Sequence, residues 1–542
     1  MKINGKTTSE TKTIDSIGYT TQHQSTKKIF DEIETISIKL TEKGYINNQI
    51  IKKNKENDSI YTAIISLKKK IKHIHIYIGT KNKPYVDFFN EPESDSITLP
   101  YTGVKAFLEH TLQNLETKGY AFSKVQLINF QQKEQNLYAD LSISVSERRR
   151  LSNIEIKYSN PKQKKLFPKG AEKQIDKKYK NNIFNQEIVK QIYNDFEKFS
   201  FIKQVKPPEI LFTKDTSKVF VYLEKRKANN FDGYLGFNNT ENKKIRFNGY
   251  LNLTLVNTLK YGEEITIYWK NNGNNQRQFD ASLNIPYLFN SPITLKGLIN
   301  IFKQDSIFQN TKTSLQIGYL LNYNKRLYLG YESTESSDIQ NLNTQNLTDY
   351  KNTFYTASIE FKKNNSNNEL IPVKSSLDLN IGTGKRTTTS NSSLTQNFVN
   401  FNIMNNFYIS KKNIVNIKSQ NYFLKSKNYI INELYRFGGI NSVRGFSENS
   451  LQANLMIALI TEYRYLISSN LYFNSILDYC YSEDPITLND TQKNNQLLGI
   501  GLGLGAITAN GLLKFTITNG KTTNEEIKFY NTNITISYNV KF

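Results

Sequence analysis

Apolar and polar residues alternate one by one along most of the chain after residue 228. The segments SLDLNI (376–381) and VNFNI (399–403) carry apolar side chains at every second position, with polar residues between them. FYTASIEF (354–361) and the final NITISYNVKF (533–542) follow the same pattern. A period of two residues predicts β-strands that present one wet face and one dry face. Such segments recur about every 20 residues, which leaves room for about sixteen strands.

Alternation alone does not separate a water-soluble sandwich from a transmembrane barrel, because both have one wet face. Three details favour the barrel: regular strand spacing, connections rich in Asn, Ser and Thr that are long on alternate sides, and an aromatic last residue. Tyr538, Val540 and Phe542 would form the apolar face of the last strand. We therefore predict that residues 228–542 form an all-β transmembrane barrel of about 16 antiparallel strands.

Residues 1–227 have a different pattern, in which helical and strand periods take turns. LKKKIKHIHIYIG (67–79) and ERRRLSNIEIKYS (147–159) share a layout: a strand ends, three basic residues follow, and an alternating strand begins. Helical segments close with Lys-Gly-Tyr at Tyr45 and Tyr120. This repeat predicts three small α+β domains, each with a strand, helices and two further strands. Their expected bounds are 1–69, 70–148 and 149–227.

Composition argues against membrane-spanning helices. Hydrophobic residues make up 38% of the chain, the mean hydropathy is -0.55, and the longest unbroken aliphatic run is 455–460. A spanning helix needs roughly 18 apolar residues, so helical insertion is excluded. A closed barrel remains compatible with these values because alternate positions of its strands are polar.

The net charge of +23 raises nucleic acid as a partner. The excess is spread thinly, and its densest runs, Lys68 to Lys70 and Arg148 to Arg150, take equivalent places in the repeat. No aromatic-basic binding motif accompanies them, so we expect no nucleic-acid partner and interpret both runs as domain-junction surface. Attraction to anionic lipid head groups or to unfolded acidic clients is a weaker option.

Residues that carry chemistry are few. The single cysteine, Cys480, excludes an intrachain disulfide framework and is interpreted as a small strand residue. His73 and His75 share one strand face, but no third ligand lies nearby in the sequence, so we expect neither a metal site nor a cofactor. Without a nucleophile elbow, a phosphate loop or a paired metal motif, an enzyme is not expected.

One stretch breaks the strand pattern. In RFGGINSVRGFSEN (436–449), the glycines Gly438, Gly439 and Gly445 allow tight turns and close backbone approach. GGINSVRGF resembles the Val-Arg-Gly-Phe/Tyr motif in the sixth surface loop of the BamA/TamA and two-partner-secretion transporter family; the matching residues here are Val443, Arg444, Gly445 and Phe446. The resemblance implies POTRA domains, which run strand, two helices, two strands, ahead of a sixteen-stranded barrel. It also implies that the loop folds back into the barrel and that its arginine pairs with acids of the lumen.

Two acids suit that pairing. Glu462 in ALITEYRYLI and Asp478 in SILDYCY lie on strand faces opposite their apolar neighbours, so both would point into the lumen. A guanidinium carried there has a rigid fork of donors that needs such acceptors. The alternative is an exposed hairpin tip with a solvated Arg444. A glycine stripe would also face inward, either to curve the strand or as a seat for the loop; its members are Gly499, Gly501, Gly503 and Gly505.

The resemblance implies a factor that assembles or translocates proteins at the bacterial outer membrane, with POTRA domains in the periplasm that receive clients by strand addition. The weakest joint would be the seam between 231–239, which Gly233 and Gly236 weaken, and 534–542. Opening there would expose an edge that templates an incoming strand, so the seam is a candidate lateral gate. The runner-up is a two-partner-secretion transporter that exports a partner through the lumen. A passive porin would leave the repeats without a purpose.

Expected partners are unfolded outer-membrane or secreted client proteins, outer-membrane lipids, and accessory lipoproteins or periplasmic partners. The start of the chain, MKINGKTTSE, lacks the apolar core of a secretory signal and opens inside a strand. We therefore expect that an export signal is missing or has been removed.

Overall fold

The computed structural model describes two compact units. The first comprises residues 1–154, 179–191 and 210–219, and the second comprises 155–178, 192–209 and 220–542. Within the described residues, no helix has the length and hydropathy needed to cross a bilayer. The described residues are 1–57, 60–86, 95–159, 166–214, 216–239, 245–271, 276–341, 344, 346–365, 368, 370–389, 392–486, 493–523, 527 and 532–542.

The first repeat is a three-stranded sheet with two helices. Its elements are β1 (Lys2–Gly5), α1 (Thr8–Ile17), α2 (Thr26–Glu42), β2 (Gln49–Lys55) and β3 (Tyr61–Ser66), in the sheet order β1-β3-β2. Thr7 and Glu10 form a capping box that starts α1. On α2, apolar residues three and four positions apart give a buried face against the sheet: Ile29, Ile33, Ile36 and Leu40.

The second repeat departs from the expected element order. Its elements are β4 (His73–Tyr77), η1 (Lys83–Tyr85), β5 (Ser96–Pro100), η2 (Tyr101–Gly103), α3 (Val104–Thr117), β6 (Lys124–Lys133) and β7 (Asn136–Ser144). The sheet order is β5-β4-β7-β6. Among its described residues, α3 is the one α-helix, and the edge strand β5 precedes it. The alternation in KHIHIYI predicted β4 correctly, since the side chains of Ile74 and Ile76 in this strand are buried.

The third repeat follows the expected order of a strand, two helices and further strands. Its elements are β8 (Arg150–Tyr158), α4 (Lys169–Tyr179), α5 (Gln186–Phe196), β9 (Ile202–Gln204), β10 (Glu209–Phe212) and β11 (Thr216–Lys225). The sheet order is β10-β11-β8, and β9 also pairs with β11. The three α+β folds are therefore present. Their bounds at residues 69, 148 and 227 stay a prediction.

Arg149, in the second basic triplet, lies at a junction between repeats. Its backbone N–H donates to the carbonyl of Gly119, the glycine of the second Lys-Gly-Tyr, at 2.9 Å. Its guanidinium donates to the carbonyl of Thr213 at 2.8 Å and lies over the rings of Phe122 and Phe212. Through Arg149, the triplet therefore makes contacts between repeats, and the charge of this residue is not wholly solvated.

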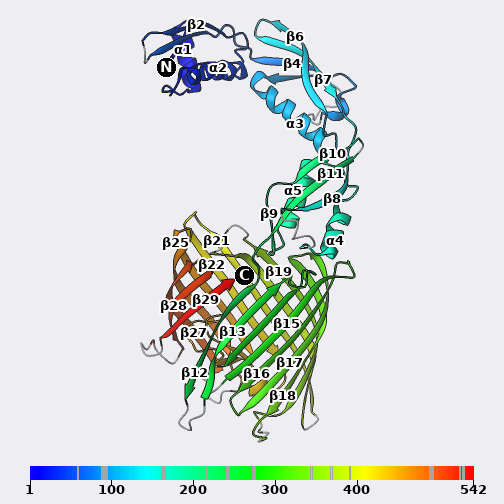
Figure 1. Ribbon diagram of the computed structural model, residues 1–542, viewed down its shortest axis with the longest axis vertical. Coiled ribbons are helices and arrows are strands. Elements are labelled where there is room, and N and C mark those ends of the chain that lie inside the picture. Colours follow the sequence, from blue (N-terminus) through cyan, green and yellow to red (C-terminus); the bar gives the residue numbers. More distant parts are fainter. Residues whose placement is uncertain are drawn as a thin grey trace. The chain divides into compact units, whose positions relative to one another are not determined.

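Residues after 229 form one closed barrel of sixteen antiparallel strands (Figure 1). Each strand pairs with the next barrel strand along the chain, and the last strand pairs with the first. The strands are β12 (Asn230–Asn239), β13 (Ile245–Val256), β14 (Glu264–Asn271), β15 (Gln276–Leu288), β16 (Ile293–Gln304), β17 (Phe308–Asn322), β18 (Lys325–Asp338), β19 (Tyr350–Asn364), β20 (Val373–Thr388), β21 (Ser393–Tyr408), β22 (Asn413–Lys425), β25 (Leu455–Ser468), β26 (Leu471–Glu483), β27 (Asn494–Ile507), β28 (Gly511–Lys521) and β29 (Asn533–Lys541). The predicted fold class is confirmed.

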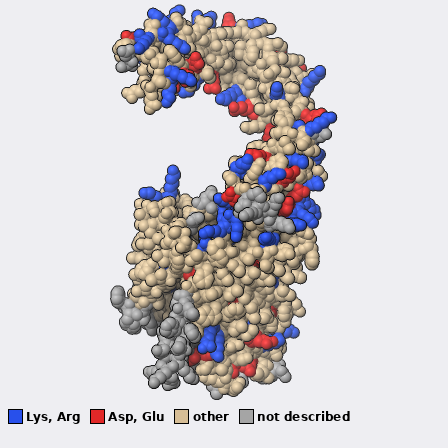
Figure 2. Space-filling view, in the orientation of Figure 1, with Lys and Arg blue, Asp and Glu red and all other residues tan. Residues whose placement is uncertain are grey.

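The two faces of the barrel strands differ as the alternation predicted. Outward side chains are apolar and exposed, which is the arrangement of a wall that faces lipid. Figure 2 shows a broad band of the barrel surface almost without charged side chains, with Lys, Arg, Asp and Glu gathered towards its two ends. Exposed outward residues include Leu315, Ile317, Leu329, Tyr355, Leu477, Leu502, Ile534 and Ile536, and buried inward residues include Gln316, Thr356, Asn416 and Asn474.

The seam that closes the barrel is its shortest pairing. Residues 230–232 of β12 pair with residues 539–541 of β29, so the register spans three pairs. Every other neighbouring pair in the barrel has a register of eight to fifteen pairs. In the described part of both strands, residues 233–239 pair only with β13 and residues 533–538 only with β28.

The barrel has a short-turn end and a long-loop end. At the short-turn end, the second compact unit also contains contacts with the third repeat. Tyr323, in the turn after β17, is buried and its ring lies 4.4 Å from the ring of Phe199. Asn257, after β13, donates its side-chain amide to the carbonyl of Leu166 at 2.8 Å. These contacts join the repeat to the barrel wall beside its opening.

Candidate functional site: a loop folded into the barrel

The segment 426–454 leaves the barrel after β22 and returns to it at β25. It contains η4 (Ile431–Glu433) and a short hairpin of β23 (Tyr435–Phe437) and β24 (Leu451–Ala453). Its apolar side chains pack on inward residues of the barrel wall, so the loop lies in the lumen. The shared core consists of Phe437, Val443, Ala453, Met456, Ala458, Ile460, Cys480 and Leu497, with Tyr435, Phe446 and Leu451 at its margin.

The motif glycines shape the loop backbone. Gly438 and Gly439 have φ values of 102° and 95°, in the region that favours glycine, and turn the chain away from β23. Gly445 has a φ of 90°, and a Cβ there would lie 2.4 Å from the backbone of Asn519 in β28. A Cβ on Gly499 would likewise lie 2.2 Å from the carbonyl oxygen of Arg444. The loop therefore rests directly on the backbone of β27 and β28.

Only one glycine of the stripe in β27 serves as a seat for the loop. The other three face side chains of neighbouring barrel strands, where a Cβ would meet Thr518, Asn474 or Tyr472. Gly499 thus fits the loop-seat interpretation, and the others fit close packing within the wall. Gly520 on β28 is a second seat, because a Cβ there would lie 2.8 Å from the carbonyl of Gly445 and from the ring of Phe446.

Arg444 joins the two acids that the alternation placed on the inner wall. Its Nε donates to Asp478 Oδ2 at 2.8 Å and its Nη2 to Asp478 Oδ1 at 2.6 Å, a two-point contact. Its Nη1 donates to Glu462. Its own backbone N–H also donates to Asp478, at 3.0 Å. The Arg444 side chain is 5% exposed and that of Asp478 is 0% exposed, so this contact is shielded from water.

The charges of this cluster balance. Glu462 accepts on its other oxygen from Nε of Arg464 at 2.7 Å, and Nη2 of Arg464 forms an ion pair with the same oxygen at 2.6 Å. Two guanidinium groups thus face two carboxylates, and Asp478 also accepts from the backbone N–H of Thr461 at 3.1 Å. Buried charges are tolerated only when they are paired and hydrogen-bonded in this way. We call this cluster of Arg444, Glu462, Asp478 and Arg464 the arginine clasp.

A second buried ion pair holds the same loop with the opposite polarity. Glu433, on the loop, pairs with Arg386 on the inner face of β20, and their side chains are 1% and 3% exposed. Glu433 also accepts from the side chain of Gln396 at 2.8 Å and from the backbone of Ile430 at 3.1 Å. We call this group the glutamate clasp.

Asn432 extends the glutamate clasp along the wall. Its side-chain amide donates to Ser336 Oγ at 2.8 Å and to the carbonyl of Thr348 at 2.9 Å. Its carbonyl accepts from Asn310 at 2.6 Å and from Tyr350 at 3.2 Å. The loop is therefore fixed to β25 and β26 through its tip, and to β17, β18, β19 and β20 through its base.

Sequence reasoning missed the glutamate clasp. A weak signal exists: YIINELY (429–435) places Asn432 and Glu433 in an otherwise apolar run, where polar residues need partners. The period of two also puts Arg386 on the same inward face as Gly382 and Gly384. Nothing in the spacing connects the two, because Arg386 and Glu433 lie on different segments.

Removing one partner of the ion pair in the glutamate clasp tests its role. Glu433→Gln leaves Arg386 buried without its carboxylate, which costs about 3 to 5 kcal/mol, so the loop base should loosen. The core cysteine Cys480 is the natural reporter, since it is the single cysteine and is fully buried under the loop. We expect faster maleimide labelling of Cys480 in Glu433→Gln and in Arg386→Ala.

The double variant Arg386→Glu with Glu433→Arg restores the opposite charges and should return labelling towards the wild-type rate. The amide oxygen of Gln396 has no partner in the described structure and could accept from the new arginine. Labelling in the double variant as fast as in both single variants would show that the pair does not hold the loop.

The residues predicted for the seam lie on the first and last barrel strands, β12 and β29, but only part of the predicted joint is paired. Val540 is opposite Phe231, and the backbone N–H of Phe542 donates to the carbonyl of Asn229 at 3.1 Å. The hydroxyl of Tyr538 lies 2.8 Å from that of Thr508, in the turn between β27 and β28. Gly233 and Gly236 pair with β13, opposite Leu251 and Asn248, and neither pairs with β29.

Comparisons with known proteins give one matching family model and several similar solved structures. The model of the Omp85 superfamily domain matches residues 257–538. CdiB from Acinetobacter baumannii is 14% identical, with a TM-score of 0.53 and 85% of each chain covered. CdiB from Escherichia coli is 12% identical, with a TM-score of 0.51, covering 96% of this chain and 100% of that one. BamA from Haemophilus ducreyi lacking POTRA domains 1–3 is 16% identical, with a TM-score of 0.49, covering 87% of this chain and 100% of that one. No curated protein gives a significant match.

A sixteen-stranded barrel with an apolar outer band and its own loop pinned in the lumen defines an outer-membrane barrel protein. The chain belongs to the Omp85 superfamily, because the family domain covers more than half of it. This confirms the resemblance carried by GGINSVRGF. The protein therefore acts at the bacterial outer membrane, in the insertion or translocation of client proteins.

Proposed function

We propose that the protein assembles client proteins into the outer membrane, with the seam between β12 and β29 as its lateral gate. The short register of that seam carries the proposal. Hydrogen bonds of a ladder contribute about 0.5 to 1.5 kcal/mol each in water, so a three-pair joint opens at a much smaller cost than its neighbours. An opened seam presents two strand edges, which are templates for an incoming strand.

The N-terminal repeats receive clients before the barrel does. The short-turn end, to which the third repeat is joined, faces the periplasm in this proposal. Edge strands support the role of the repeats in receiving clients. β2 and β6 are each at an edge of their sheet, and β6 carries exposed Ile128 and Phe130. An extended client segment could add to such an edge through backbone hydrogen bonds with little sequence selectivity. Lipids of the outer membrane contact the apolar band, and accessory lipoproteins or periplasmic partners would bind the repeats.

The two clasps hold the loop as a brace across the lumen. In this proposal Arg444, Glu462 and Asp478 keep the wall from β25 to β28 in shape next to the seam. Gly445 and Phe446 support the same wall by packing on β28. Export of a partner through the lumen remains the second candidate function, because a large cavity adjoins the seam inside the barrel.

Depletion tests the proposed function. If the protein is an assembly factor, lowering its level should reduce the amount of other barrel proteins in the outer membrane, measured by quantitative proteomics of purified membranes. The transporter alternative expects the loss of one secreted partner with unchanged barrel proteins. Unchanged levels of both would contradict the assembly role and the export role together.

A further inference from the structure

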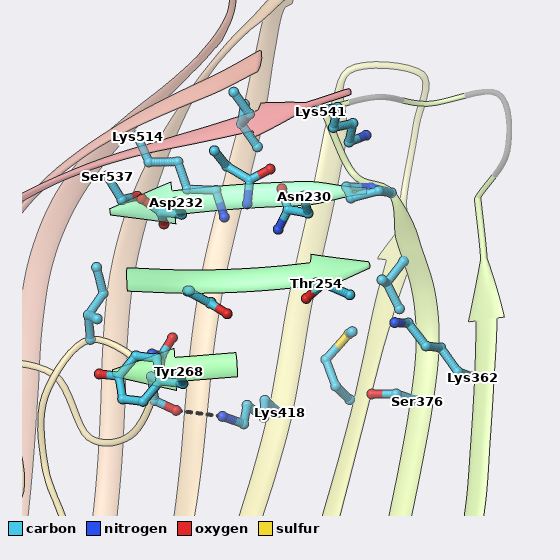
Figure 3. A pocket seen from close by; sticks show the side chains of 18 of the residues that line it. Asn230, Asp232, Thr254, Tyr268, Lys362, Ser376, Lys418, Lys514, Ser537 and Lys541 are labelled. Carbon is cyan, nitrogen blue, oxygen red and sulfur yellow. Dashed lines mark hydrogen bonds between the residues drawn. The ribbon is translucent and has the colours of Figure 1, made fainter. Parts of the chain in front are cut away.

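The barrel lumen contains a cavity of about 1970 Å³ next to the folded-in loop. Its walls come from the inner faces of the barrel, from the loop, and from the linker that precedes β12. Figure 3 shows Lys362, Lys418 and Lys514 around this cavity, with Asp232 and Tyr268 on the β12 side. Residues from both faces of β29 line it, including Ile534 and Thr535, so it reaches the unpaired part of the seam.

The cavity has an excess of positive charge. Among the described residues that line it, thirteen are Lys or Arg and seven are Asp or Glu. Three of the acids already have cationic partners: Glu360 pairs with Lys296, Glu448 with Lys270, and Glu462 with the arginine clasp. The hydroxyl of Tyr250 donates to Asp232, a fourth acid, at 2.6 Å. The surplus is therefore cationic.

This surplus is concentrated at the short-turn mouth. Lys225 is the last residue of β11, and Arg226 and Lys227 lie between β11 and β12. Lys362 is near the end of β19, and Lys541 is the last residue of β29. Within the described part of the chain, no ion pair involves these five side chains. We name these five residues and Lys514 the cationic vestibule. A concave surface of one sign concentrates its field and attracts ligands of the other sign.

We propose that the cationic vestibule binds an acidic, extended segment of the client polypeptide and directs it towards the seam. This inference rests on the proposed function and adds the chemistry of the client. The wall between the lysines offers amides and hydroxyls, including Asn230, Asn252, Ser376, Ser537 and Asn539. Such groups hydrogen-bond to a peptide backbone without reading its sequence, while the cations select carboxylates.

Peptide binding to the full-length protein in nanodiscs of zwitterionic phosphatidylcholine tests the proposal. The probes are a fluorescent peptide of Glu, Ser and Gly and its isostere with Gln in place of Glu. We expect the Glu peptide to bind about tenfold more tightly at about 50 mM salt, with the preference shrinking at about 300 mM because screening weakens the attraction. A photo-crosslinker at Ser376, in the cavity, should capture the peptide, and one at the outward Leu329 should not.

A matched pair of triple variants locates the effect. Lys225→Gln, Lys362→Gln and Lys541→Gln together should remove most of the preference for the Glu peptide. Lys325→Gln, Lys411→Gln and Lys412→Gln remove the same charge from exposed positions outside the cavity and should leave it unchanged. Equal binding of the two peptides, or equal loss in both triple variants, would overturn the inference.

Two further outcomes separate related ideas. Displacement of the peptide by short-chain phosphatidylglycerol, with no effect of a Gln peptide, would assign the vestibule to a lipid head group and overturn the peptide proposal. If depletion lowers the level of barrel proteins while the nanodisc experiment shows no acidic preference, the proposed function stands and this inference fails. A preference for the Glu peptide without a depletion effect would support this inference and contradict the proposed function.

Discussion

Replacing Arg444 with alanine is expected to leave the barrel folded and inserted but to abolish its activity. The change removes the two-point contact to Asp478, which is 0% exposed, and one partner of Glu462. Leaving a buried carboxylate without its partner costs about 3 to 5 kcal/mol. That cost raises the population of the released loop by a factor of about 10² to 5 × 10³. Insertion is checked by heat-modifiable gel mobility, and activity by the amount of client barrel protein.

Cys480 reports loop release directly. It lies in the apolar core that the loop covers, so maleimide should label it slowly in the wild type and much faster in Arg444→Ala. Arg444→Lys keeps the charge without the planar fork and should give an intermediate labelling rate. The exposed Arg277 on β15 provides the control, since Arg277→Ala should change neither readout. Wild-type activity together with slow labelling in Arg444→Ala would sink the assignment of the clasp.

The parts of the fold that depend on local periodicity could be predicted from the sequence. In SILDYCY, the period of two correctly separated outward Leu477 and Tyr479 from inward Asp478, and this holds because one face of a barrel strand is apolar. The position of Arg444 next to Glu462 and Asp478 could be anticipated for a similar reason. Both acids are on the two strands that follow the loop. The resemblance to the family motif implied that the loop folds back into the barrel.

Contacts that depend on how distant segments meet could not be predicted. Arg386 and Glu433 are each unremarkable on their own segments, and only the folded loop brings them together. The length of the seam is another example. The glycines of β12 indicated a weak strand, but nothing in the sequence tells that β29 pairs with three residues of it rather than ten. The edge strand β5 was not expected either, because SITLP alternates over too few residues to stand out from the repeat pattern.

Locking the seam with a disulfide should stop client insertion reversibly. Phe231 and Val540 are register partners across the seam. Opposite residues of an antiparallel pair have Cα atoms about 4.5 to 5.5 Å apart, which suits a disulfide. In a Cys480→Ala background, the variant Phe231→Cys with Val540→Cys should insert clients when reduced and lose this activity on oxidation. Reconstituted insertion of a purified barrel client, with and without reductant, measures the effect.

The location of the lock matters because only one joint has to open. Leu315 and Tyr331 are outward register partners in the long pairing of β17 with β18. A disulfide between cysteines at these two positions links strands that fourteen register pairs already hold together. The oxidised control should therefore stay active. An oxidised seam variant that still inserts clients at the wild-type rate would exclude the seam as the gate. If such a variant also continued to export a secreted partner, the lumen would become the route of transport.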